Sequence, residues 1–513
     1  MGKSFRDSMQ WLHTWAGLCL GTVLFAVFWM GTLSVFDREI DRWMMPATRV
    51  APTELKSVDA LASQMQPLVG ASPLWLVLFP SDREPVARVG YLAGGGKIRY
   101  RQADPSTSIL LPDTGTWAGT GFIYPFHVNL HIRAWSLGLW IVGLAGMGML
   151  ALCVSGVVIH RKIFADFFTF RSDRKARRLV LDLHNVTGVL GLPFHFFITL
   201  SGVVIFFTVY FAGAWEMSYR GDRQAFVQES YGIYARPRLD RPGPPMASLD
   251  AMVEQASREW NGGTPQLLRV FHRGDANAYV EVRRSFVGDR VTMPVDALYF
   301  DAGTGAVLSR HTAQPVMAAH RFITGFHFVQ FDHWPLRWLY FALGLTGCVL
   351  IATGFLFWLE SRRKRHEQLG LAGVRLVDGL AVGSVSGILA ATLAFFVVNR
   401  LLPSAVSAGA FERADLEVGA FYLVWLGSFA HAWLRPRRAW REQCIAIALL
   451  AIAAVTLNWA TTGDAVWRSL SQQRLWPVAG MDLVLLLGAA AAWLVVVKLS
   501  TSAGEHRRKP LPG

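Results

Sequence analysis

Eight long apolar runs constrain what this chain of 513 residues can fold into. A helix that crosses the hydrocarbon core of a membrane needs about 20 mostly apolar residues. The runs lie at roughly 13–36, 135–160, 184–212, 336–359, 376–400, 418–434, 442–460 and 478–498. With 52% hydrophobic and only 17% charged residues, the chain has too little polar surface for several soluble cores. We therefore predict a polytopic all-α membrane protein with about eight transmembrane helices.

Basic residues indicate which way these helices face. They gather in five segments that flank alternate ends of the runs, namely 1–12, 161–183, 360–375, 435–441 and 498–513. Together these segments hold 22 Lys and Arg against 7 Asp and Glu, which accounts for the net charge of +14. Because cytoplasmic loops are enriched in Lys and Arg, both termini are expected inside. The basicity thus reflects topology, and no nucleic-acid partner is expected.

Two long segments, 37–134 and 213–335, are expected on the outer side. Each begins with a helix-like stretch, at about 53–66 and 247–259, and continues with runs of alternating apolar residues that are typical of strands. The sequence therefore predicts a small α+β domain in each outer segment.

An internal repeat relates the two halves of residues 1–360. His13 and His184 have matching neighbours at the same offsets, which are Gly17 and Gly188, Gly31 and Gly202, and Phe36 and Phe207. Ser155-Gly156 in the second run likewise matches Thr353-Gly354 in the fourth. We predict two copies of one unit, 1–160 and 184–360, joined by the basic loop 161–183. Since both copies start inside, the repeat is parallel, with a pseudo-two-fold axis along the membrane normal. Four further helices follow at 376–498, and 499–513 is a basic cytoplasmic tail.

The repeat brings histidines into pairs. Equivalent residues of a parallel repeat lie at equal depth, so His13 pairs with His184 near the inner face. His131 and His327 are roughly equivalent near the outer face, and His127 lies one helical turn before His131. Two imidazoles that face each other across an axis are what a six-coordinate haem requires. Two such pairs predict one haem near each face.

Two further histidines are candidates for the same chemistry. His195 lies three helical turns after His184, in mid-membrane, where an imidazole is costly without a functional partner. His160 closes the second run beside Arg161 and Lys162. It could equally be an ordinary interfacial polar group, and that alternative stays open for each histidine at a membrane edge.

Four segments carry a resemblance to a known family: 12–36, 155–171, 181–204 and 337–365. They resemble the PepSY-associated transmembrane family of iron-regulated inner-membrane proteins, which includes a ferrisiderophore reductase. The turn at 301–308 looks like the strand-turn-strand signature of a PepSY domain. The resemblance implies four core helices that carry b-type haem, two PepSY-like periplasmic domains, and reduction of ferric siderophores in the bacterial inner membrane. The haem-associated positions that the resemblance favours are His13, His131, His184, His195 and His327, followed by His160. The four helices after residue 375 depart from the shorter family members.

The leading hypothesis is an inner-membrane oxidoreductase with about two haem b groups. It would take electrons from a cytoplasmic or quinol donor and pass them to a periplasmic ferric siderophore. Reduction helps release, because hard oxygen ligands hold Fe(II) more weakly than Fe(III). There is no GxGxxG fingerprint, so direct binding of a nicotinamide or flavin nucleotide is not expected. The alternatives are a non-enzymatic membrane anchor whose PepSY-like domains regulate a periplasmic protease or another partner, and a siderophore transporter.

Overall fold

The structure is a computed structural model that describes residues 4–69, 72–93, 98–160, 176–285, 291–293, 296–436 and 438–508. The chain divides into two compact units. The helical unit comprises residues 1–45, 115–200 and 339–513, and the sheet unit comprises residues 46–114 and 201–338. Of the first predicted outer segment, 37–134, only residues 46–114 belong to the sheet unit. Residues 37–45 and 115–134 belong to the helical unit.

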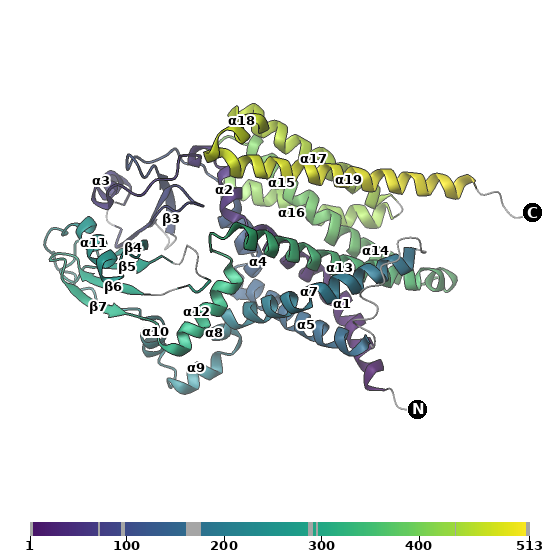
Figure 1. The fold of residues 1–513 in the computed structure, drawn as a ribbon, viewed down its shortest axis with the longest axis horizontal. Coiled ribbons are helices and arrows are strands. Elements are labelled where there is room, and N and C mark those ends of the chain that lie inside the picture. The colour runs from purple at the N-terminus through teal and green to yellow at the C-terminus, as the bar shows by residue number, and fades with distance from the viewer. Residues whose placement is uncertain are drawn as a thin grey trace, which may run out of the picture. The chain divides into compact units, whose positions relative to one another are not determined.

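The helical unit is built from long helices joined by short ones (Figure 1). Its long helices are α1 (Phe5–Ser34), α5 (Leu137–Ile159), α7 (Ala176–Ile205), α13 (Trp334–Gln368), α15 (Ile388–Leu401), α16 (Arg413–Leu434), α17 (Ala439–Thr462) and α19 (Trp476–Arg508). The shorter elements are α2 (Asp37–Met44), η3 (Gly119–Ile123), α4 (Tyr124–Asn129), η4 (Ala134–Ser136), α14 (Gly373–Val382), η5 (Gly383–Gly387), α18 (Val466–Ser471), η6 (Gln473–Leu475) and the hairpin of β8 (Ser407–Ala408) and β9 (Phe411–Glu412). The end of α7 and the start of α13 continue into the sheet unit.

Seven helices of the described residues are long and apolar enough to cross a membrane. They are Phe5–Ser34, Ala134–Ile159, Arg177–Ile205, Trp334–His366, Gly373–Leu401, Ala439–Thr462 and Gln473–Thr501. The prediction of a polytopic helical membrane protein is confirmed, although the eighth predicted span differs. Residues 418–434 do form most of α16, but Glu417, Ser428 and His431 make this helix less apolar than the other seven. The inward orientation of both termini stays a prediction.

The sheet unit contains one antiparallel sheet of seven strands in the order β3-β2-β1-β4-β5-β6-β7. The strands are β1 (Leu74–Leu78), β2 (Ala87–Leu92), β3 (Ile98–Ala103), β4 (Pro265–Phe271), β5 (Tyr279–Arg284), β6 (Ala297–Asp301) and β7 (Val307–His311). The two predicted domains thus share one sheet, which is joined where β1 pairs with β4. This pairing has a physical reason, because each half alone would expose the unpaired backbone of an edge strand.

Helices α3 (Val58–Val69) and α11 (Leu249–Glu259) cover one face of the sheet. Their N-termini cap each other reciprocally. The Asp59 carboxylate accepts from the Leu249 amide at 2.9 Å, and the Asp250 carboxylate accepts from the Val58 amide at 2.6 Å. The two helices thus contact each other through matching groups at their N-termini. The remaining helices of this unit are α8 (Phe207–Tyr210), α9 (Ala212–Ser218), α10 (Arg223–Tyr231) and α12 (Pro315–Phe328).

Candidate functional site

His13 of α1 and His184 of α7 lie together in the helical unit. Their ring centres are 6.4 Å apart and their planes are nearly perpendicular, at 88°. Two imidazoles that share one metal at about 2.0 Å per bond have ring centres about 6 Å apart. The pair predicted from the repeat therefore has the separation that a single shared metal ion requires.

Hydrogen bonds fix which nitrogen of each ring carries the proton. The Leu350 carbonyl can only accept, so His184 Nδ1–H donates to it at 3.0 Å. Ser155 donates its own hydroxyl proton to the Leu152 carbonyl at 3.2 Å, so its oxygen accepts from His13 Nδ1 at 3.0 Å. In both rings Nε2 consequently keeps its lone pair, and neither Nε2 has a hydrogen bond to a described residue. This is the tautomer that a metal-binding histidine needs.

Small residues surround both rings in the same way. A Cβ on Gly156 would lie 3.4 Å from His13 Cε1, and one on Gly354 would lie 3.5 Å from His184 Cε1. Within the described residues there is no group of three or more His, Cys, Asp or Glu side chains that could hold a metal ion. Two protein ligands beside small residues do fit a haem, because its macrocycle supplies the other four nitrogens.

His195 and His160 are bonded differently from this pair. His195 is 1% exposed, and its Nε2–H donates to the Leu343 carbonyl of α13 at 3.2 Å. Its Nδ1 is buried and has no partner in the described part of the chain. The bond links α7 to α13 and occupies the nitrogen that is free in His13 and His184. His160 follows the last residue of α5, and its Nδ1 also has no partner among the described residues.

At the other end of the repeat, the structure gives His127 the environment that we expected for His131. His127 Nδ1 donates to the Val27 carbonyl at 2.8 Å, and its ring fills the space beside Gly31, where a Cβ would lie 2.7 Å away. In the sheet unit, His327 Nδ1 lies 3.0 Å from the Ser201 hydroxyl, and its ring fills the space beside Gly202. Gly31 and Gly202 are equivalent in the repeat predicted from the sequence, so in that repeat His127, and not His131, corresponds to His327.

His131 lies just beyond the end of α4 in left-handed backbone, with φ of 54°. Its ring packs against Trp117, with the ring centres 4.9 Å apart, and its Nε2 lies 3.4 Å from Arg133. Burial, and secondly Arg133, lower the pKa of His131 to about 4. The sequence contained a signal for His127, because a phenylalanine precedes both His127 and His327.

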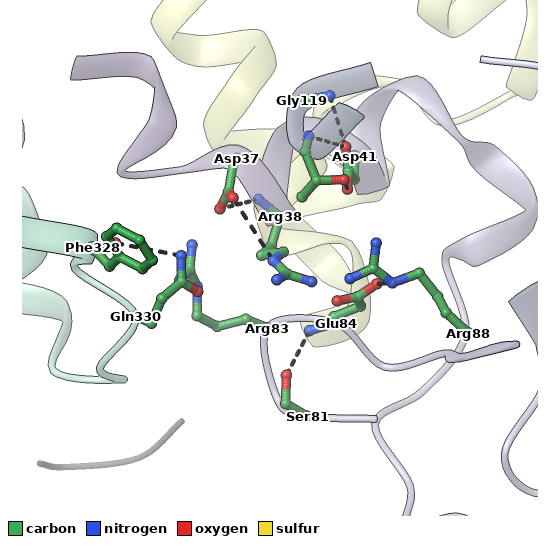
Figure 2. Close-up of polar contacts among 11 residues, drawn as sticks. Asp37, Arg38, Asp41, Ser81, Arg83, Glu84, Arg88, Gly119, Phe328 and Gln330 are labelled. Carbon is green, nitrogen blue, oxygen red and sulfur yellow. Dashed lines mark hydrogen bonds and ion pairs between the residues drawn. The ribbon is translucent and has the colours of Figure 1, made fainter. Parts of the chain in front are cut away.

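The helices after residue 375 hold the segment that carries His127. Tyr422 of α16 donates to the Leu130 carbonyl at the end of α4 at 2.6 Å, and Phe126 packs on Phe421. The residues just before α4 are held by α2: the amides of Gly119 and Thr120 donate to the Asp41 carboxylate at 2.7 and 3.0 Å (Figure 2). The later helices are therefore part of the core of the helical unit.

A buried polar network reinforces this packing. Glu417 of α16 accepts from Asn399 at 2.9 Å, forms an ion pair with Arg413 at 3.0 Å, and also accepts from Thr116. Its side chain is fully buried. A second buried carboxylate, that of Asp482, accepts from Trp43 Nε1 at 2.7 Å. Each carboxylate thus links a residue within 1–160 to a helix that follows residue 375. Glu417 of α16 contacts Thr116, and Asp482 of α19 contacts Trp43.

A family model described as the PepSY-associated TM region matches residues 10–361. The chain belongs to the PepSY-associated TM family. An uncharacterised protein of Pseudomonas aeruginosa is 30% identical to it over 382 residues, which is 70% of this chain and 90% of the relative.

Membership of the PepSY-associated TM family confirms the resemblance predicted from the sequence. Together with the seven apolar helices, it makes the protein a multi-pass membrane protein in contact with the lipid bilayer. The bacterial relative fits the predicted location in a bacterial inner membrane. The family match contains all the candidate histidines and ends before α14, so the later helices are an addition to the family region.

Proposed function

We propose that this protein is an inner-membrane haem b oxidoreductase. It takes electrons one at a time from a cytoplasmic or quinol donor and delivers them to a periplasmic ferric siderophore, so that each Fe(III) gains one electron and leaves as Fe(II). The observation that carries this proposal is the His13–His184 pair, with its 6.4 Å separation and its two free Nε2 atoms. A haem b held by this pair supplies reversible one-electron transfer.

The surrounding residues hold the two rings in place. The Ser155 hydroxyl and the Leu350 carbonyl each accept a hydrogen bond from a ring Nδ1, which fixes ring orientation and makes the imidazole a stronger ligand. Thr353, 3.2 Å from His184 Nδ1, adds a second contact on that side. Gly156 and Gly354 leave room beside the rings.

The purified protein tests this proposal directly. Produced in haem-replete cells, it should be red, with a Soret band that shifts and sharpens on reduction by dithionite. After excess dithionite is removed under anaerobic conditions, a ferric siderophore should reoxidise the protein, with one Fe(II) formed per electron lost. A colourless protein would contradict haem binding, whereas a reduced haem that the ferric siderophore leaves reduced would contradict the siderophore as acceptor.

His127 and His131 make separate predictions about a second haem. We expect His127→Ala to lower the haem content by about one haem per chain, because its ring, like that of His327, fills the space beside a glycine and has a hydrogen-bonded Nδ1. His131→Ala should leave the ratio unchanged, since its Nε2 lies beside Arg133. The pyridine haemochrome assay gives the ratio for both variants. If His131→Ala lowers the haem content and His127→Ala does not, the pairing of His131 with His327 that the sequence predicted would be supported instead.

A further inference from the structure

A row of side chains on the face of the sheet opposite α3 and α11 contains an unusual excess of positive charge. The register pairs Arg283 of β5 with Ala297 of β6, and Ala297 with His311 of β7. Side chains that are paired across adjacent strands point to the same face. Arg283 and His311 therefore flank the small methyl group of Ala297.

Helix α12 adds one more basic group, Arg321, beside this row. The Arg321 guanidinium lies 5.1 Å from the ring centre of Tyr231. Burial, followed by the charge of Arg283, lowers the pKa of Arg321 from its usual range, although Tyr231 acts in the other direction. Burial also lowers the pKa of His311, with Arg283 and Arg321 contributing and Asp296 opposing.

The cluster has buried nitrogen atoms without hydrogen-bond partners. Arg321 Nε and His311 Nε2 are buried and lack a partner in the described part of the chain. Leaving a buried polar group unpaired costs free energy, more so when the group is charged.

The neighbouring carboxylates are already shared among other arginines. Glu281 contacts Arg269 at 2.6 Å as well as Arg283, and Asp301 of β6, on the same face, lies 2.9 Å from Arg236. These two carboxylates are thus already paired, and Arg321 has no ion pair with a carboxylate of the described residues. Like charges held close together destabilise the empty cluster, and an anion would relieve this repulsion.

We propose that Arg283, His311 and Arg321 form a binding site for carboxylate oxygens. Taken with the proposed reductase function, on which this step rests, the site makes the substrate an anionic ferric carboxylate chelate. A guanidinium binds a carboxylate through two parallel hydrogen bonds, and a neutral imidazole can donate a third. His327 follows Arg321 by six residues on α12, about 9 Å along the helix axis. The helix that contributes to the anion site therefore also carries a candidate haem ligand.

The test uses the full-length protein in detergent and gallium(III) citrate, a redox-inactive substitute for ferric citrate. Calorimetry should show binding that weakens as salt is added, because the site attracts its ligand through charge. Arg321→Gln should weaken binding at least tenfold, and His311→Gln should weaken it less. The matched control is Arg310→Gln on the same strand, since Arg310 forms an exposed ion pair with Glu259 at 2.7 Å. Its affinity should stay within twofold of the wild type.

Each outcome decides one part of the proposal. No binding of gallium citrate, or equal affinities for Arg321→Gln and Arg310→Gln, would overturn the site. Tight binding of inorganic phosphate without binding of the chelate would overturn the assignment of the substrate. An unchanged haem spectrum and melting temperature show that a variant is folded, and if Arg321→Gln fails this check, His311→Gln decides. Binding of gallium citrate by a protein that contains no haem would support the anion site and reject the reductase function. A haem-loaded reductase whose affinity for gallium citrate is unchanged by Arg321→Gln would support the reductase function and reject the anion site.

Discussion

Replacing His184 by alanine should remove the haem held near His13, and the haem-to-protein ratio should fall accordingly. The reason is the fixed tautomer: His184 donates Nδ1–H to the Leu350 carbonyl, which leaves the Nε2 lone pair to bind the haem iron in the proposed site. Loss of a group that only orients a ligand costs about 10- to 100-fold in metal affinity, and loss of the ligand itself should cost more. Pyridine haemochrome analysis and the Soret absorbance per chain measure the effect.

Two variants on α13 serve as controls for this experiment. His366→Ala removes an imidazole that packs on Trp358, with ring centres 5.6 Å apart, and should leave the haem content unchanged. Thr353→Val removes only one contact of His184 Nδ1, since the Leu350 carbonyl remains, and should shift the reduction potential while the haem is retained. If His184→Ala keeps full haem content, His184 is not a ligand and the site proposed here is wrong.

Glu417→Ala should cause the largest loss of stability among single changes outside the histidine sites. The substitution leaves Arg413 and Asn399 without their buried carboxylate partner. Removing one member of a buried ion pair costs about 3–5 kcal/mol, because the other charge remains desolvated. Unfolding of the purified protein by a denaturing detergent, followed by tryptophan fluorescence, measures the change in the free energy of unfolding.

The matched control for Glu417 is Glu442→Ala. Glu442 is also paired with an arginine, Arg435, at 2.8 Å, but both side chains are solvent-accessible. Exposed ion pairs contribute little to stability, so this variant should unfold close to the wild type. Equal effects of the two substitutions would show that the buried network does not stabilise the helical unit.

Hydropathy and repeat offsets predicted much of this architecture because both are local properties of the sequence. The apolar runs located seven spans, and identical offsets from His13 and His184 predicted a pair that lies 6.4 Å apart in the structure. The span that was not recovered, α16, holds Glu417 in a network with residues distant in sequence. Hydropathy is averaged over neighbouring residues, so it does not register that Glu417 is paired with Thr116 and Asn399 from other parts of the chain.

Strand pairing and the choice between His127 and His131 depend on contacts that the sequence pattern does not contain. Alternation identifies a strand and its two faces, but the second partner of β1, beside β2, proved to be β4, nearly 200 residues later. His127 and His131 are one helical turn apart, so their spacing favoured neither. The choice is made by Leu130, whose left-handed backbone ends α4 and turns His131 away from the helix face.

The seam between β1 and β4 has a consequence for how the protein is made. Ribosomes synthesise β1 to β3 first, and α5 and α7 must both emerge before β4 exists. Until then, the half-sheet has an open edge at β1, the kind of edge that promotes aggregation in nascent chains. Biogenesis of the sheet is therefore coupled to membrane insertion of the intervening helices, and a chain that stops after the first repeat would be a substrate for quality-control proteases.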